Sequence, residues 1–200
     1  MDEPRLTRRE RQALTRDRLI EVASEELLRS GFRGTSLERV AEAAGFSKGA
    51  VYSNFASKED LVLAVLDQRF RHRLDTLRDE LAAAPENVED RLATFSNWWA
   101  ELVTEQGWGV LIFELASHSR DKPEIRQQLT QREVAIVDFV GMLIAAEAER
   151  FDITLAMPAR DLATVLVSLG SGLSFSAMLE PSTPVDVMAT VARLVLLGHT

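Results

Sequence analysis

The stretch that decides the fold lies at residues 35–55, which read TSLERVAEAAGFSKGAVYSNF. Ala41 is small, so a second helix can approach the first closely. Gly45 comes four residues later, where the chain must turn sharply and a positive φ is inexpensive only for glycine. Val51 follows six residues on and can pack back between the two helices. This Ala-x3-Gly-x5-Val spacing predicts a helix-turn-helix, with one helix ending near Gly45 and the next running to about Phe55.

The polar residues outside this hairpin favour DNA as its partner. In a DNA-binding helix-turn-helix, the N-terminal part of the second helix enters the major groove. Here residues 47–50 supply a hydroxyl, a cation and two small side chains. Tyr52 can place its hydroxyl on a phosphate, and Lys58 lies beside the start of the next helix, whose free amides also suit a phosphate. The alternative is a structural hairpin whose polar side chains are simply solvated.

Composition and charge bound the remaining possibilities. The 200 residues are 46% hydrophobic, carry a formal net charge of −8 and include no cysteine. This excludes a disordered chain, disulfides and cysteine-ligated metals. The acidity lies beyond residue 60, since residues 1–60 have 11 basic and 11 acidic side chains and residues 61–200 have 12 and 20. Residues 5–58 have 11 basic against 7 acidic, so the two parts are expected to differ in function.

Helical periodicity runs along almost the whole chain, and strand-like alternation is rare. Capping-box patterns that open at Thr7, Thr35 and Ser57 mark helix starts, and Gly31 marks a helix end. We therefore predict an all-α protein.

The composition shift places a domain boundary near residue 60. Residues 1–60 are expected to form a three-helix, helix-turn-helix domain, and residues 61–200 a second helical domain. Residues 1–11 are expected to form a flexible basic arm, which either reaches along DNA or is a solvated terminus.

Residues 31–61 resemble the N-terminal domain of the tetracycline-repressor (TetR) family of bacterial transcription regulators. The resemblance is carried by Gly31-Phe32-x-x-Thr35-Ser36-x-x-x-Val40-Ala41-x-x-Ala44-Gly45-Phe46-Ser47-Lys48-Gly49-Ala50-Val51-Tyr52-x-x-Phe55-x-x-Lys58-Glu59-x-Leu61. It implies a homodimer that binds a palindromic operator, with a C-terminal domain that binds a small inducer and pairs the subunits. It also implies a set of DNA contacts, at Thr35, Ser36, Ser47, Lys48, Gly49, Ala50, Tyr52, Ser53, Asn54 and Lys58.

The second domain has a cluster of aromatic residues suited to a ligand. All three tryptophans lie within eleven positions, beside a helix break at Gly107 and Gly109. Large indoles at such a break can line a cavity, although the same spacing is typical of ordinary core. We expect a small apolar or amphipathic inducer to contact Phe95, Trp98, Trp99, Leu102, Trp108, Phe113, His118, Phe139 and Met142.

An uncharged run of 18 residues spans 162–179. It is just long enough to cross a membrane, but seven of its positions are hydroxyl residues or glycine and it lacks basic flanks, so we prefer a buried helix. The resemblance implies that this helix and the last one form a four-helix bundle across a two-fold axis, while a purely intrachain core is the alternative. The expected dimer contacts are Leu166, Leu169, Leu173, Phe175, Val187, Val191, Leu194 and Val195.

The remaining expectations concern function class. The N-terminus has no apolar stretch behind its basic residues, so a cytoplasmic protein is expected. The chain has three histidines and no metal-ligand cluster, phosphate loop or nucleophile elbow, so neither an enzyme, a metal nor a cofactor is expected. The principal expectation is a repressor that an inducer of unknown identity releases from DNA. An activator of the same fold and a helical ligand-binding protein that does not bind DNA are the alternatives.

Overall fold

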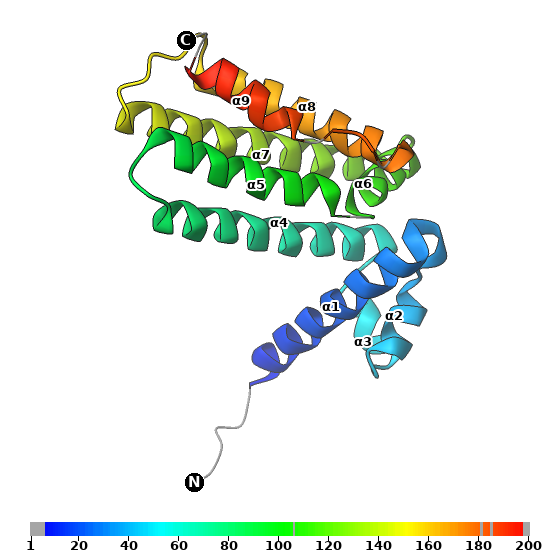
Figure 1. Cartoon of the computed structure of the whole chain (residues 1–200). Coiled ribbons are helices and arrows are strands. Elements are labelled where there is room, and N and C mark those ends of the chain that lie inside the picture. Colours follow the sequence, from blue (N-terminus) through cyan, green and yellow to red (C-terminus); the bar gives the residue numbers. More distant parts are fainter. Residues whose placement is uncertain (1–6, 106, 181, 185, 198–200) are drawn as a thin grey trace. The chain divides into compact units, whose positions relative to one another are not determined.

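The computed structural model describes residues 7–105, 107–180, 182–184 and 186–197. This part of the chain is helical and contains no strand, which confirms the expected all-α class (Figure 1). Its helices are α1 (Arg8–Gly34), α2 (Leu37–Ala43), α3 (Lys48–Tyr52), α4 (Lys58–Ala83), α5 (Val88–Thr104), α6 (Trp108–His118), α7 (Pro123–Arg150), α8 (Ala159–Leu179) and α9 (Val187–Leu197).

The chain divides into two compact units, Met1–His72 and Arg73–Thr200. The boundary lies within α4 rather than at residue 60, because the first part of that helix groups with α1, α2 and α3. Its residues Leu61–Leu66 are buried. One helix therefore supplies residues to both units.

The start of α1 follows the predicted capping box. Thr7 is the N-cap; its hydroxyl accepts from the Glu10 amide at 3.2 Å, and the Glu10 carboxylate accepts from the Thr7 amide at 2.7 Å. The predicted stop at Gly31 is instead a kink. Gly31 has φ 67 and ψ 179, and helical structure resumes as far as Gly34.

Two details of α2 and α3 differ from the sequence prediction. The N-cap of α2 is Ser36, whose hydroxyl accepts from the Arg39 amide, rather than Thr35. Thr35 is buried, and its hydroxyl donates to the Gly31 carbonyl at 2.9 Å. The Thr35 side chain thus connects the segment that leads into α2 with the kink at Gly31. The end of α3 comes at Tyr52, three residues before the predicted end.

The turn between α2 and α3 forms as the spacing predicts. Gly45 has φ 74, its amide donates to the Glu42 carbonyl, and the Phe46 amide donates to the Ala41 carbonyl at 2.8 Å. These two bonds form a Schellman motif, which ends α2 and redirects the chain. Ala41 and Val51 are buried, so the small and the branched residue do pack between the helices.

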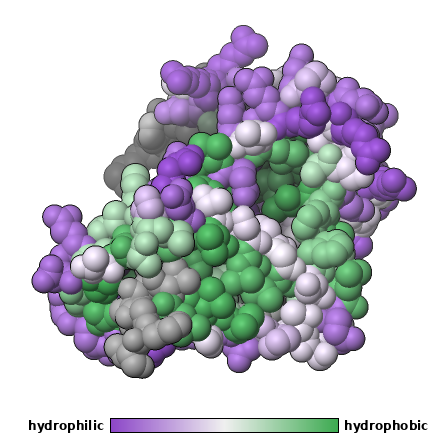
Figure 2. Space-filling view, turned by 90° about the horizontal axis from the view of Figure 1, so that it is seen from above, coloured by the Kyte–Doolittle hydropathy of each residue, from purple (hydrophilic) through white to green (hydrophobic). Residues whose placement is uncertain are grey.

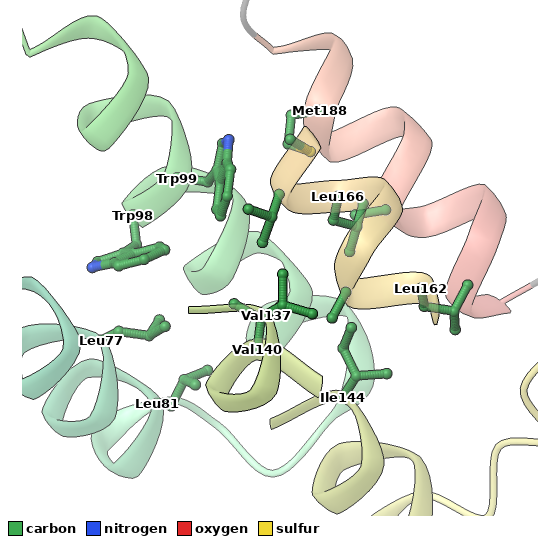
Figure 3. Packing of buried hydrophobic residues seen from close by; sticks show 13 residues of the cluster. Leu77, Leu81, Trp98, Trp99, Val137, Val140, Ile144, Leu162, Leu166 and Met188 are labelled. Atoms are coloured by element: carbon green, nitrogen blue, oxygen red, sulfur yellow. The ribbon is translucent and has the colours of Figure 1, made fainter. Parts of the chain in front are cut away.

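The second unit has a core built from α4, α5, α7, α8 and α9 (Figure 3). Trp98 and Trp99 belong to this core, and the Trp98 indole donates to the Arg73 carbonyl at 2.8 Å. The Trp99 indole lies so close to Gly170 of α8 that any side chain at that position would overlap it. Gly170 therefore allows α8 to pack closely against α5 within the chain.

The helix α8 has the length and composition of a membrane span, with a mean hydropathy of 1.7 over its most apolar window. In the second unit it packs against α5, α6, α7 and α9, and Leu162, Ala163 and Leu166 are completely buried. In this apolar window of α8, 28% of the residues are buried, so most of them keep some exposure to solvent. One face of α8 is thus core, and the other is an apolar surface.

Candidate functional site

The second helix of the hairpin, α3, presents its N-terminal end to solvent. Ser47 caps it, with its hydroxyl accepting from the Ala50 amide at 3.2 Å. Lys48 and Gly49 are exposed, while Val51 is buried. The cation and the glycine backbone are therefore free to approach a major groove, as the predicted DNA surface requires.

The aromatic hydroxyl of this surface is held by an acidic partner. Tyr52 is 51% exposed, and its hydroxyl donates to the Glu38 carboxylate of α2 at 2.6 Å. This hydrogen bond lowers the pKa of Glu38 below its ordinary value and raises the pKa of Tyr52 above its own. The negative charge of Glu38 thus lies where a phosphate would otherwise accept from Tyr52.

Lys58, the second expected phosphate contact, is directed toward α1. Its ammonium group donates to the Phe32 carbonyl at 2.8 Å and lies 4.1 Å from the centre of the Phe32 ring. It therefore holds α4 to α1, as Thr35 holds α2.

The last expected contacts, Ser53 and Asn54, donate to the Ala50 carbonyl at 2.8 Å each. Arg16 of α1 donates to the Asn54 carbonyl at 2.9 Å and stacks 4.3 Å over the Phe55 ring. Sequence reasoning missed Arg16 because nothing in the local pattern shows which residues α1 brings to the end of α3.

A cavity of ≈ 70 Å³ lies in the second unit. It is bounded by the end of α4, the first half of α5, the end of α7, the following loop and α8. Most of its lining is apolar, and two of its residues are charged. The lining consists of Leu81, Val88, Arg91, Leu92, Phe95, Leu143, Ile144, Glu147, Ala148, Phe151, Ile153, Leu155 and Leu166.

The two charged lining residues form an ion pair. Arg91 is 7% exposed, and its Nε and Nη2 both donate to the Glu147 carboxylate, with Nη2 at 2.6 Å from Oε1. Its Nη1 donates to the Leu81 carbonyl at 2.7 Å. The carboxylate raises the pKa of Arg91, so the guanidinium is charged at every physiological pH. Arg91 thereby joins the end of α4 to α7.

The loop that closes the cavity begins with a second Schellman motif. Asp152 has φ 52, its amide donates to the Glu149 carbonyl, and the Ile153 amide donates to the Ala148 carbonyl at 2.8 Å. In this motif the residue after the left-handed one packs back on the helix. The side chains on either side of Asp152, Phe151 and Ile153, accordingly line the cavity.

The comparisons with known proteins agree with this geometry. The model of "Bacterial regulatory proteins, tetR family" matches residues 19–65, which include the whole hairpin. Residues 19–65 are therefore similar to the tetR family of bacterial regulatory proteins. The HTH-type transcriptional regulator TtgR of Pseudomonas putida is 28% identical, over 97% of this chain and 93% of its own length. The HTH-type transcriptional repressor AcnR of Corynebacterium efficiens is 26% identical, over 90% and 93%.

A solved structure has the same fold over nearly the whole chain. It is the transcriptional regulator FadR from Bacillus subtilis in complex with stearoyl-CoA, with a TM-score of 0.72 at 14% identity, covering 92% of this chain and 99% of that one. The matched hairpin and the named relatives identify the present chain as a DNA-binding transcription regulator.

The expected ligand contacts do not all line the cavity. Only Phe95 lines the cavity. Trp98, Trp99, Leu102 and Phe139 belong to or pack on the core, and Trp108 is buried outside that cluster. Met142, Phe113 and His118 are exposed, Met142 to 67%. The Phe113 ring lies edge-on to Phe175 with 5.1 Å between ring centres, and Nε2 of His118 lies 2.9 Å from the Lys122 ammonium.

Among the described residues, the expected dimer contacts divide into three groups by burial. Leu166 is completely buried and lines the cavity, so its assignment to a dimer interface was wrong; it lies on the core side of α8. Leu169, Leu173 and Val191 are partly buried against the core. Phe175, Val187 and Leu194 are exposed, and the side chain of Val195 lies outside the described part of the structure.

Further apolar side chains extend this surface on α8. The side of the molecule on which α8 and α9 lie shows a broad apolar region bordered by hydrophilic residues (Figure 2). Three exposed apolar residues of α8 were not selected by the sequence analysis, namely Val165 at 44%, Met178 at 40% and Leu179 at 68%. We call the exposed residues Val165, Phe175, Met178, Leu179, Val187 and Leu194 the apolar face.

Proposed function

We propose that this chain is a homodimeric repressor that binds a palindromic operator through α3 and leaves it when a small inducer binds in the second unit. The observation that carries the DNA-binding role is the exposed N-terminal end of α3, fixed by the Gly45 turn with Lys48 and Gly49 directed to solvent. The name of AcnR, a transcriptional repressor that aligns over 90% of this chain, supports repression.

The apolar face supports dimerisation. Soluble monomers rarely expose large contiguous apolar patches, and such patches mark interaction sites. Pairing two copies across a two-fold axis covers the same residues on both. It also provides the two recognition helices that a palindrome requires, at about 34 Å for successive major grooves.

A direct test of the dimer uses light scattering at micromolar concentration. Leu194→Glu, which places a charge on the apolar face, should shift the protein toward monomer. Met142→Glu is the control, because Met142 is also an exposed apolar residue but lies on α7, outside the apolar face. A wild-type monomer, or equal behaviour of both variants, contradicts this interface.

The DNA-binding role is tested by selecting binding sites from a random DNA pool, followed by gel-shift titrations at several salt concentrations. If Lys48 contacts a phosphate, Lys48→Ala should weaken binding and reduce the salt slope by about one. Arg120→Ala, which removes an exposed cation from the second unit, is the control. Failure to select any sequence would favour the alternative of a helical ligand-binding protein.

The inducer-binding role rests on the cavity and on the continuity of α4. Leu81, near the end of α4, lines the cavity, and the first part of the same helix belongs to the DNA-binding unit. A ligand that moves the end of α4 thereby acts on a helix shared by both units. A coupling of about 1–3 kcal/mol is enough to change operator affinity roughly 5–150-fold.

A further inference from the structure

The cavity of the second unit contains an ion pair whose two members differ in exposure. Arg91 has a side chain 8% exposed, whereas that of Glu147 is 29% exposed. Removing one partner from a buried pair is costly for the charge left behind, and least costly for a group that water can reach. A ligand that breaks this pair will therefore release Glu147 and keep Arg91.

The Arg91 guanidinium also has unused hydrogen-bonding capacity. It carries five N–H donors. Within the described residues, two of these donate to Glu147 and one to the Leu81 carbonyl. Two N–H groups at the cavity wall therefore remain for an incoming acceptor, and planar carboxylates suit the guanidinium best because they can accept two such bonds at once.

The rest of the lining determines the body of such a ligand. Eleven of the thirteen lining residues are apolar, so polar substituents away from the head group would lose hydrogen bonds to water on entry. One water needs roughly 10–15 Å³ of such space, so ≈ 70 Å³ corresponds to a body of about five heavy atoms.

We propose that this cavity binds a compact apolar monocarboxylate, whose carboxylate takes the place of Glu147 on Arg91 while Glu147 turns to solvent. A cationic ligand is disfavoured, because pairing with Glu147 would leave the buried Arg91 without its counter-ion. This inference deepens the proposed function by naming the inducer class.

The exchange has a consequence for α4. Arg91 bonds both the Leu81 carbonyl of α4 and the Glu147 carboxylate of α7. When a ligand carboxylate replaces Glu147, the link from α4 to α7 is cut and the end of α4 is tied to the ligand instead. Binding in the cavity thereby alters how the helix shared by both units is held.

Direct binding to the full-length protein without DNA tests the site. Hexanoate and benzoate are titrated by calorimetry, each beside its neutral isostere, hexanamide or benzamide. Tryptophan fluorescence gives a second signal, because the ring of Phe95 lies 6.0 Å from Trp98 and 5.9 Å from Trp99. We expect each carboxylate to bind at least about tenfold more tightly than its amide, the usual effect of charged hydrogen bonds.

Two variants should shift this preference in opposite directions. Arg91→Gln should reduce the difference between carboxylate and amide to within about twofold, and Glu147→Gln, which removes the competing carboxylate, should strengthen carboxylate binding about tenfold. The matched controls are Arg160→Gln and Asp138→Asn. These residues form an exposed Arg–carboxylate pair across α7 and α8 at 2.8 Å, outside the cavity.

The outcomes are separable from those of the proposed function. If Arg91→Gln fails to fold, Glu147→Gln alone decides. Equal binding of acid and amide, no binding of either acid at millimolar concentration, or weaker binding by Glu147→Gln would each overturn the inference, even if another compound releases the protein from its operator. Carboxylate binding in a protein that selects no DNA would instead contradict the proposed repressor and leave the site intact.

Discussion

Replacing Gly170 by alanine adds a methyl group where the Trp99 indole already lies. A Cβ at this position would overlap Cζ2 and Cε2 of Trp99 and lie 2.6 Å from its Nε1. The indole has little room to retreat, because Trp99 is 5% exposed and its ring centre lies 5.9 Å from that of Phe95 and 5.8 Å from that of Trp98.

The size of the effect follows from this overlap. Because the added Cβ would lie well inside ordinary van der Waals contact, α8 and the indole must move apart. Overpacking a core costs about 1–3 kcal/mol, and a rigid ring over a helix backbone places Gly170→Ala at the upper end, about 3 kcal/mol. For a chain of this length, that lowers Tm by roughly 6–12 °C.

Gly172 provides the control on the same helix. A Cβ there meets nothing within 4 Å in the chain, so Gly172→Ala should stabilise the helix by about 0.5–1 kcal/mol. Both variants are unfolded in urea at one protein concentration and followed by tryptophan fluorescence. Light scattering is run alongside, so that a change of assembly at Gly172 is recognised.

Two results would refute this account of the core. One is a Gly170→Ala protein as stable as Gly172→Ala. Removing the ring should relieve the clash, so the double variant Gly170→Ala, Trp99→Leu should be more stable than the sum of the two single effects predicts. The second refuting result is a double variant whose stability equals or falls below that sum.

Three further predictions concern the ends of helices and the DNA surface. Glu38→Gln should tighten DNA binding severalfold in gel shifts, because it removes the negative charge that holds the Tyr52 hydroxyl. The gain should vanish in the Tyr52→Phe background, and an equal gain there would disprove that Glu38 acts through Tyr52. Because the hydrogen bond from Tyr52 lowers the pKa of Glu38, the contact should persist above the ordinary pKa of a carboxylic acid and be lost as pH falls through the lowered one, measured as a shift of the Glu38 carboxyl signal in NMR titrations. Asp152→Gly should preserve or raise Tm, since glycine adopts a positive φ without strain, whereas Asp152→Val should lower stability by about 1–2 kcal/mol; equal Tm values for the two would contradict a left-handed requirement.

The local pattern around the hairpin was sufficient to predict its structure. The turn at Gly45, the burial of Ala41 and Val51, and the cap at Ser47 all follow from interactions within twenty residues, and all are present in the structure. Short-range sterics and capping do not depend on distant parts of the chain, so a single sequence can specify them.

The roles of individual side chains at the DNA surface were less predictable. Thr35 and Lys58 were expected on phosphates, yet they bond to carbonyls of the kinked end of α1. Their partners lie up to 26 residues away, and no periodicity in the sequence shows which carbonyl a side chain will reach.

The site in the second unit depended on tertiary structure altogether. The clustering of tryptophans in the sequence suggested a cavity at the indoles, but two of them, Trp98 and Trp99, pack into the core. The cavity instead lies beside Arg91 and Glu147, which are 56 residues apart in sequence. The sequence by itself determined the helical class, the caps at Thr7 and Ser47 and the turn of the hairpin, because local sterics and periodicity govern those features. Only the tertiary structure decided which aromatic residues fill the core, which face of α8 stays open and where a ligand can enter, because packing joins residues whose separation along the chain carries no signal.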